Sequence, residues 1–325
     1  MIQEIKIRIY QTFNGRLYSL CSHLGCYLAF VYFWFYKKNN QVVLAPTSAI
    51  GDVLYVLSFW ENFGKQGGVF YISDRYKDFL ESFQLAPKIK IVYLQHGGFF
   101  HCFLMMFECC KNHKVLRKLS KKRGIIFPVP HVYKNDDFIW NGNKPKGIRH
   151  QLSRILDLPL DPISLHHLTT ISIKSIPNFE QSKQKICVLN PYSNSMQSSL
   201  LLFEKIAEEL KKRDFIVYTN VVNGQKEIRG TLSLECSLQE LYSIAKEIPL
   251  IVSLRSGILD LLIPSNINMF VVYGVWKVPF VQDEDYSIKE WHPKGKLREV
   301  SIKTKSEEKI VEDFQSFLQQ LRSES

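Results

Sequence analysis

The segment LIVSLRSGILDLL, residues 250–262, shows how this 325-residue chain is organised. Its first five residues form a largely apolar run that predicts a buried strand, and residues 257–262 predict a short helix. Arg255 and Ser256 stand at the turn between the two elements. Because short apolar runs alternate with helical patterns elsewhere in the chain as well, the predicted fold class is α/β, with open parallel sheets covered by helices.

The second half of the chain repeats this alternation. It predicts one Rossmann-like, doubly wound domain over residues 183–325. Strands are predicted at residues 185–189, 215–219, 250–254 and 269–273, and helices at residues 200–212, 238–246, 257–262 and 307–321.

The first half has the same organisation and predicts a second Rossmann-like domain over residues 41–165. A linker containing Pro177 is expected at residues 166–182. We expect the two domains to face a central cleft, with ligands at the carboxyl ends of the strands. Strands are predicted at residues 42–44, 69–72, 89–94 and 125–127, and helices at residues 52–63, 76–83 and 100–110.

Several functions are disfavoured by composition and by missing motifs. The G-x-G-x-x-G fingerprint and the P-loop pattern are both absent from the sequence, which disfavours NAD chemistry and P-loop NTP hydrolysis. A net charge of +11 favours anionic partners such as phosphates, acidic glycans or a lipid surface. No nucleic-acid partner is expected, because no RNA- or DNA-binding module is recognised. The seven cysteines lack the paired spacing of a zinc site, so we expect no metal. We expect no other cofactor either. This cysteine usage favours a reducing, cytoplasmic setting.

The first 40 residues contain LYSLCSHLGCYLAFVYFWFY, a twenty-residue run at positions 17–36 without a formal charge. This length suffices for a helix that crosses a bilayer. Polar residues at helical spacing, such as Ser19 and Ser22, and the aromatic cluster at 32–36 favour instead a hydrophobic helix lying in the membrane surface. A spanning helix and a soluble helix packed on the first domain are the alternatives. Aromatics and lysines stand where a signal peptide would have small residues, so a cleaved signal peptide is not expected.

Small polar residues follow three predicted strands of the second half, where they form a candidate binding site. Amides, hydroxyls and a guanidinium at strand ends can hold phosphate oxygens. Two alternatives stay open: Arg255 pairs with Asp260 in a structural ion pair, and Trp276 packs on a loop instead of stacking on a nucleobase. The candidates are Asn190, Tyr192, Ser193, Ser253, Arg255, Ser256, Gly257, Asp260, Gly274 and Trp276.

The first half also places polar residues after its predicted strands. In APTSAIGDVLYVLSFW, residues 45–60, Gly51 and Asp52 open a helix directly after a strand. Gly51 allows close approach to the backbone, and Asp52 is expected at the mouth of the cleft, although a plain helix cap is the alternative. Gln95 and His96 follow another predicted strand.

The order of these motifs resembles that of the lipopolysaccharide heptosyltransferases, glycosyltransferase family 9, which have the GT-B architecture of two Rossmann-like domains. The resemblance covers roughly residues 42–279 and implies that Asp52 is the general base, which accepts the proton of an acceptor. His96 is then the second candidate for the base, and Gly51 and Gln95 are candidate acceptor contacts. The family's D-S-G-x-x-H segment reads here as RSGILD, residues 255–260, and its basic residue after the N-P-G-type loop has no match in residues 192–199. A nucleotide-sugar donor is therefore implied, but ADP-heptose is not. The motifs are Ile50-Gly51-Asp52, Leu189-Asn190-Pro191, Leu238 with Leu241, Ser256-Gly257, and Gly274 with Pro279.

These observations favour a glycosyltransferase that moves a sugar from a nucleotide-sugar donor to a bacterial surface glycan or glycolipid, such as lipopolysaccharide or capsule. We expect an inverting, metal-independent reaction with Asp52 as the base, in an enzyme attached peripherally to the cytoplasmic face of the inner membrane. One alternative is a fucosyltransferase-like enzyme that uses a GDP-sugar. Another is a noncatalytic, membrane-associated binding protein with a degenerate glycosyltransferase fold.

Overall fold

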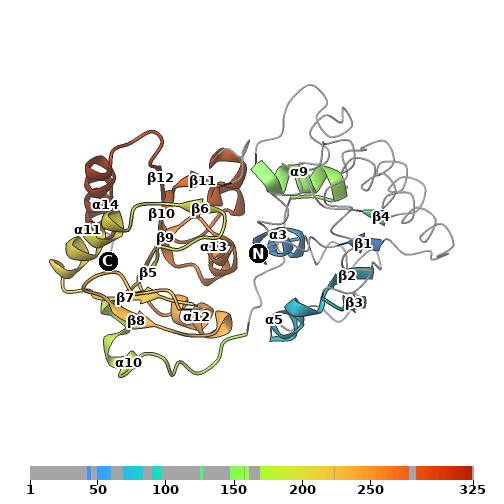
Figure 1. Cartoon of the computed structure of the whole chain (residues 1–325), viewed down its shortest axis with the longest axis horizontal. Helices are drawn as coiled ribbons and strands as arrows, with labels where there is room; N and C mark the ends of the chain where they lie inside the picture. Colours follow the sequence, from blue (N-terminus) through green and yellow to red (C-terminus); the bar gives the residue numbers. More distant parts are fainter. Residues whose placement is uncertain are drawn as a thin grey trace, which may run out of the picture. The chain divides into compact units, whose positions relative to one another are not determined.

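The chain divides into two compact units, Met1–Leu165 and His166–Ser325, each described by itself (Figure 1). The computed structural model describes residues 42–44, 50–59, 69–82, 90–96, 125–126, 147–156, 158–160, 169–222, 224–277 and 283–323. The predicted amino-terminal hydrophobic helix lies outside these residues. None of the helices among them is both long enough and apolar enough to span a membrane.

A parallel sheet of six strands forms the centre of the second unit, in the order β12-β10-β9-β5-β7-β8. The chain runs outward from β5 to β8, then returns to β9 on the other side of β5. The order therefore reverses between β5 and β9, where Asn190 and Ser253 are register partners. We call the carboxyl ends of β5 and β9 the switch point; ligands of open α/β sheets bind at such places. The strands are β5 Ile186–Asn190, β7 Ile216–Asn220, β8 Leu232–Leu234, β9 Leu250–Leu254, β10 Asn268–Tyr273 and β12 Leu297–Ser301.

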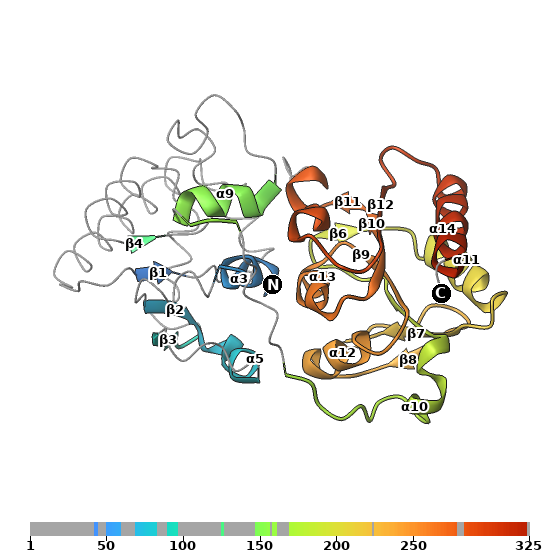
Figure 2. The same cartoon turned by 180° about the vertical axis from the view of Figure 1, so that it is seen from behind.

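Helices cover both faces of this sheet, as a doubly wound domain requires. Helices α11 (Leu200–Lys211) and α14 (Glu307–Arg322) lie together on one face, while α12 (Leu238–Ala245) and α13 (Gly257–Leu262) lie on the other (Figures 1 and 2). The apolar side of α14 meets the sheet through Phe314, whose ring centroid lies 4.9 Å from that of Phe270 at an angle of 71°. The predicted fold class is confirmed in this unit.

Two edge strands of the second unit escaped the sequence-based prediction. Strand β8 has only three residues, and its Leu232 is 52% exposed. Strand β12 carries Arg298 and Glu299 in its middle, so it lacks the apolar run of a central strand. Apolar patterning identifies strands buried on both faces and misses short or charged edge strands.

The first unit contains a smaller parallel sheet, in the order β3-β2-β1-β4. Helix α3 (Ile50–Leu57) begins two residues earlier than predicted, so Gly51 and Asp52 lie inside its first turn and Asp52 is not its cap. Helix α9 (Gly147–Leu156) was not predicted. The strands are β1 Val42–Leu44, β2 Val69–Ser73, β3 Lys90–Leu94 and β4 Ile125–Ile126, and the remaining helix is α5 Lys77–Ser82. The helix predicted at 100–110 falls outside the described residues.

Helix α9 is fixed to α3 by Arg149, whose side chain is completely buried. Its Nε donates to the hydroxyl of Ser58 at 3.2 Å, and its Nη2 donates to the carbonyl of Leu160. The guanidinium also lies 5.2 Å from the centre of the Phe59 ring. A charged residue therefore fastens α9 to the helix that carries Asp52.

Part of the predicted linker is bound to the second unit along α12. The carboxylate of Glu240 accepts hydrogen bonds from the backbone N–H groups of Lys174, at 2.6 Å, and Ser175, at 2.8 Å. The hydroxyl of Ser243 accepts one from the N–H of Ile171 at 2.9 Å. Side chains of a helix thus satisfy backbone N–H groups of a segment that belongs to no strand within the described ranges.

Candidate functional site

Unpartnered polar atoms mark the switch point of the second unit. Asn190, the last residue of β5, is 2% exposed, and both polar atoms of its side-chain amide lack a hydrogen-bond partner among the described residues. The hydroxyl of Ser256, which is 8% exposed, also lacks one there. An unpaired buried polar group costs about 1–3 kcal/mol, and folded proteins keep few of them. These two side chains are consequently the first candidates to receive a polar ligand.

The loops that follow β5 and β10 are joined above the main sheet by a small antiparallel pair, β6 (Met196–Gln197) and β11 (Val275–Trp276). Gly274 makes this pairing possible, because a Cβ atom there would lie only 2.1 Å from the carbonyl oxygen of Gln197. The N–H of Lys277 extends the connection by donating to the carbonyl of Ser195 at 2.9 Å. The two loops therefore form one structural unit at the switch point.

Tyr192 and Ser193 lie in the first of these loops. The Tyr192 hydroxyl donates to the carbonyl of Lys226, in the loop after β7, at 2.6 Å. Burial and the nearby Glu227 carboxylate raise the pKa of this phenol above its usual range, so it stays protonated at neutral pH. The hydroxyls of Ser193 and Ser195 lie 3.2 Å apart and share a hydrogen bond. These side chains brace the loop; their contact with a donor remains a prediction.

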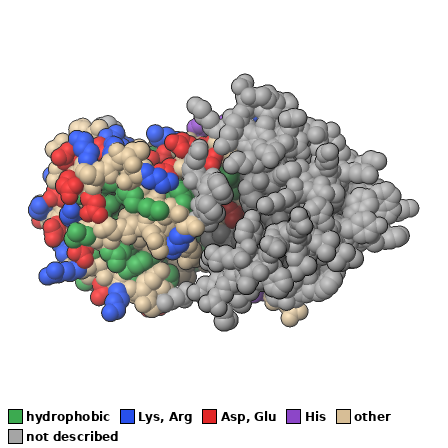
Figure 3. All heavy atoms as spheres, turned by 45° about the horizontal axis from the view of Figure 1, so that its top comes forward, with side chains coloured by type: hydrophobic (Ala, Val, Ile, Leu, Met, Phe, Trp, Pro, Cys, Tyr) green, Lys and Arg blue, Asp and Glu red, His purple; other side chains and the backbone are tan. Residues whose placement is uncertain are grey.

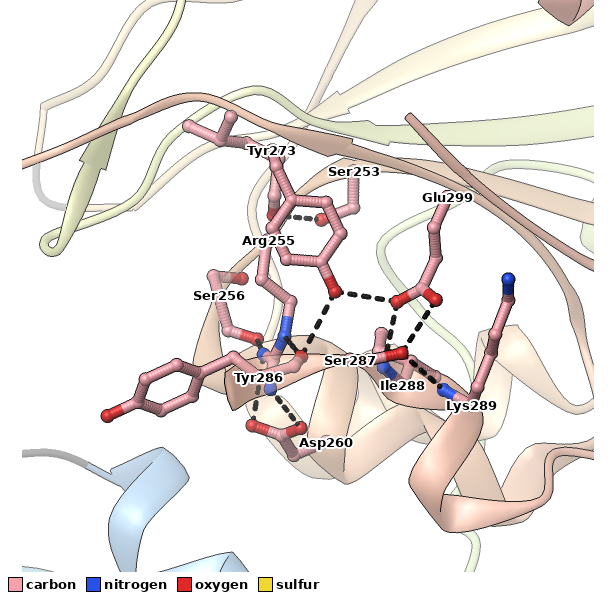
Figure 4. Close-up of polar contacts among 11 residues, drawn as sticks. Ser253, Arg255, Ser256, Asp260, Tyr273, Tyr286, Ser287, Ile288, Lys289 and Glu299 are labelled. Carbon is pink, nitrogen blue, oxygen red and sulfur yellow. Dashed lines mark hydrogen bonds and ion pairs between the residues drawn. The ribbon is translucent and has the colours of Figure 1, made fainter. Parts of the chain in front are cut away.

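Arg255 and Asp260 form the buried ion pair that the sequence left open as an alternative. Their side chains are 3% and 1% exposed, and two hydrogen bonds join them: Nη2 to Oδ1 at 2.7 Å and Nη1 to Oδ2 at 3.1 Å (Figure 4). Nη1 also donates to the carbonyl of Ser256 at 2.5 Å, and Nε donates to that of Tyr286 at 2.8 Å. The guanidinium is thus directed into the protein, a geometry that favours the ion pair over the predicted phosphate contact.

The carbonyl of Tyr286 is a second centre of this network, together with Glu299 on β12. The Tyr273 hydroxyl lies 3.0 Å from that carbonyl and 2.6 Å from Oε1 of Glu299. Glu299 also accepts hydrogen bonds from the N–H of Ile288 and the hydroxyl of Ser287, both at 2.8 Å (Figure 4). Sequence reasoning missed Tyr286 and Glu299, because neither β12 nor the short 3₁₀ turn that contains Tyr286 was predicted.

Trp276 packs on a loop, which the sequence analysis gave as the alternative to stacking on a nucleobase. Its Nε1 donates to Oδ1 of Asp283 at 2.7 Å, and its ring centroid lies 5.0 Å from that of Tyr286, with 39° between the rings. Asp283 and Tyr286 bound one 3₁₀ turn, Asp283–Tyr286. This turn holds the half-buried indole in place; stacking of a nucleobase on it remains a prediction.

The first unit brings three polar residues together at the carboxyl ends of β2 and β3. The hydroxyl of Ser73, fully buried, shares a hydrogen bond of 3.3 Å with Nδ1 of His96. The backbone N–H of His96 donates to Oδ1 of Asp74 at 2.8 Å. His96 and its neighbour Gln95 are exposed, while Asp52 is half-buried in the first turn of α3. The predicted catalytic residues of this unit thus follow its strands at the edge where ligands of α/β sheets bind.

The surface in Figure 3 shows acidic and basic side chains interspersed on one face of the second unit, with hydrophobic patches between them. The continuous basic stripe typical of nucleic-acid-binding proteins is not seen on the described part of this face. Among the residues with described positions, no three His, Cys, Asp or Glu side chains gather in a group that could hold a metal ion.

Comparison with known proteins identifies the architecture. No protein-family model matches the sequence, and no curated protein has a significantly similar sequence. The structure of a family 9 glycosyl transferase from Veillonella parvula matches with a TM-score of 0.53 and 13% identity, over 88% of this chain and 98% of that one. The E. coli ADP-heptose lps heptosyltransferase II gives a TM-score of 0.51 and 13% identity, over 88% of this chain and 100% of that one. This chain therefore has the GT-B-like fold seen in glycosyltransferases of family 9.

Proposed function

We propose that this protein is a glycosyltransferase whose second unit binds a nucleotide-sugar donor. The observation that carries the proposal is the pair of buried side chains of Asn190 and Ser256 at the switch point, which have no hydrogen-bond partner within the described part of the chain. Ligands of open α/β sheets bind at this kind of place. The glycosyltransferase fold supports the assignment, although a fold alone does not establish a function.

In the proposed reaction, Asp52 accepts the proton of an acceptor hydroxyl while that oxygen attacks the anomeric carbon of the donor sugar. A new C–O bond forms as the bond to the diphosphate breaks, and the nucleoside diphosphate leaves with the electron pair. Attack opposite the leaving group inverts the anomeric carbon. Backbone N–H groups and hydroxyls near Ser256 and Ser193 stabilise the negative charge on the leaving phosphates, the role that a divalent cation has in other enzymes.

The acceptor in this proposal is a bacterial surface glycan or glycolipid, such as lipopolysaccharide or capsule. The name of the E. coli neighbour, ADP-heptose lps heptosyltransferase II, supports this class of acceptor and a nucleotide-sugar donor. Residues 1–40 attach the enzyme peripherally to the cytoplasmic side of the inner membrane. In this proposal the uncharged run at 17–36 is buried in the membrane interface, and nearby basic side chains bind anionic headgroups.

A thermal-shift screen with ADP-, GDP-, UDP- and CMP-sugars tests the donor assignment, because a ligand that binds only the native state raises its stability. We expect one nucleotide to raise the melting temperature, and a GDP-sugar response would favour the fucosyltransferase-like alternative. Release of nucleoside diphosphate from the stabilising donor then measures catalysis. Donor binding without any turnover, in the presence of glycolipid acceptors, would favour the noncatalytic binding protein instead. No response to any donor would contradict the proposal.

A further inference from the structure

We propose that Arg255 and Asp260 are positioning residues for donor binding, which act through Ser256 and Tyr286 and do not contact the donor phosphates. This inference rests on the proposed function, because it concerns the same donor site. It assigns the ion pair a role that the order of residues alone does not indicate.

The first argument is burial. Arg255 and Asp260 are almost inaccessible, and each oxygen of the Asp260 carboxylate accepts a hydrogen bond from the guanidinium. To reach a phosphate, Arg255 would have to abandon this pairing and leave a carboxylate buried without compensation. Loss of one partner of a buried ion pair is strongly unfavourable. The negative charge that the guanidinium neutralises in this fold is therefore that of Asp260.

The second argument is the number of segments that the guanidinium joins. It binds its own turn at the Ser256 carbonyl, helix α13 at Asp260, and the end of the 3₁₀ turn Asp283–Tyr286 at the Tyr286 carbonyl (Figure 4). A planar group with donors in several fixed directions suits this task, whereas a lysine ammonium on a flexible stem does not. Arg255 therefore sets how these three segments lie relative to one another.

The third argument follows the contacts outward to residues that a donor can reach. Tyr286 packs against the half-buried Trp276, whose indole is also held by Asp283. On the other side of Arg255 lies Ser256, with its unpartnered hydroxyl. A shift of the ion pair therefore moves both the polar and the aromatic parts of the proposed donor site without removing either.

The experiment is calorimetric titration of the full-length protein with the nucleoside diphosphate selected by the screen, and with the matching nucleoside, which has no phosphates. Asp260→Asn and Tyr273→Phe are the informative variants, since the Tyr273 hydroxyl lies 3.0 Å from the same Tyr286 carbonyl and 2.6 Å from Oε1 of Glu299, which binds the two residues that follow Tyr286. We expect Asp260→Asn to weaken both ligands by about tenfold, and Tyr273→Phe to weaken both by about threefold, in line with the loss of charged and neutral hydrogen bonds. Equal losses for the two ligands show that the phosphates are not the point of contact.

Direct phosphate binding predicts the opposite sign, because Asp260→Asn would then release Arg255 to the diphosphate. Unchanged or tighter diphosphate binding in Asp260→Asn overturns the inference, as does a loss confined to the diphosphate. If Asp260→Asn does not fold, Tyr273→Phe decides by the same criterion. Arg213→Lys is the control: Arg213 pairs with Glu209 at 3.1 Å and precedes β7, so it lies toward the amino ends of the strands, away from the switch point, and its change should leave both affinities unaltered. If the wild-type protein binds none of the nucleotides, the proposed function itself fails.

Discussion

The two units present polar residues at the carboxyl ends of their strands in different ways. In the first unit, His96 is exposed and is held through single hydrogen bonds with Ser73 and Asp74. In the second, Arg255 is buried and its charge is matched internally by Asp260. The difference shows that polar side chains at strand ends are not equally available to a ligand: the imidazole of His96 reaches solvent, while the guanidinium of Arg255 is used inside the protein. Burial and hydrogen-bond geometry separate these two situations.

The largest expected effect concerns the buried pair of Arg255 and Asp260. Arg255→Met leaves the Asp260 carboxylate buried and unpaired, so the free energy of unfolding should fall by about 3–5 kcal/mol. Urea unfolding followed by tryptophan fluorescence measures it. Replacing both partners, as Arg255→Met with Asp260→Leu, should recover much of the loss. A cost below about 1 kcal/mol for the single variant, typical of surface ion pairs, would mean that the pair does not hold the second unit as described.

In the first unit, Asp52→Asn should lower turnover by roughly 100-fold or more, the usual scale for loss of a general base. Folding and donor affinity should be retained, because the change affects one half-buried side chain of the first unit. Steady-state rates and calorimetry on the same preparation separate the two quantities. Near-normal turnover would transfer the role of base to His96.

Removing the hydroxyl of Ser73 tests whether His96 has that role. Loss of one hydrogen bond costs about 1 kcal/mol, so Ser73→Ala should reduce turnover by no more than about fivefold. If Asp52 is the base, the pH dependence of the rate should not move. The rate is measured as a function of pH for the wild type and for Ser73→Ala. Thr304→Val, remote in sequence and in the other unit, is the control. A displaced pH profile in Ser73→Ala alone would contradict the assignment to Asp52.

The smallest expected effect concerns the segment bound along α12. Burial of the Glu240 carboxyl opposes its ionisation, but the N–H groups of Lys174 and Ser175 outweigh this and lower its pKa. Because the folded pKa lies below the unfolded one, the stabilisation is complete above an unfolded value of about 4.3 and disappears as the pH falls through the folded value. The free energy of unfolding should therefore fall less steeply in Glu240→Gln than in the wild type below about pH 5. Equal slopes in urea unfolding across that range would exclude the linkage.

The central strands β5, β9 and β10 of the second unit could be predicted from the sequence because they are buried and largely apolar. The run at 250–254 is an example, and it matches β9. The edge strand β12 could not be predicted, because Arg298 and Glu299 interrupt its pattern. That omission also concealed Glu299 as a member of the candidate site.

Individual side-chain roles were harder to predict than their location. Arg255 and Asp260 were both assigned to the strand-end region, but the sequence alone left two partners open for the guanidinium. The choice depends on whether the Asp260 carboxylate lies within reach, and this follows from the three-dimensional course of α13. The state of the Asn190 amide could not be predicted either. Whether its polar atoms have a hydrogen-bond partner among the described residues depends on the three-dimensional structure.

Gly274 has a consequence for how this protein can be re-engineered or can diverge. Since no side chain fits between residue 274 and the Gln197 carbonyl, the loops after β5 and β10 are paired backbone to backbone. An insertion or exchange in one loop would lose its register with the other. A chimera that imports the donor loop of another transferase should therefore transfer both loops together, as one inherited module.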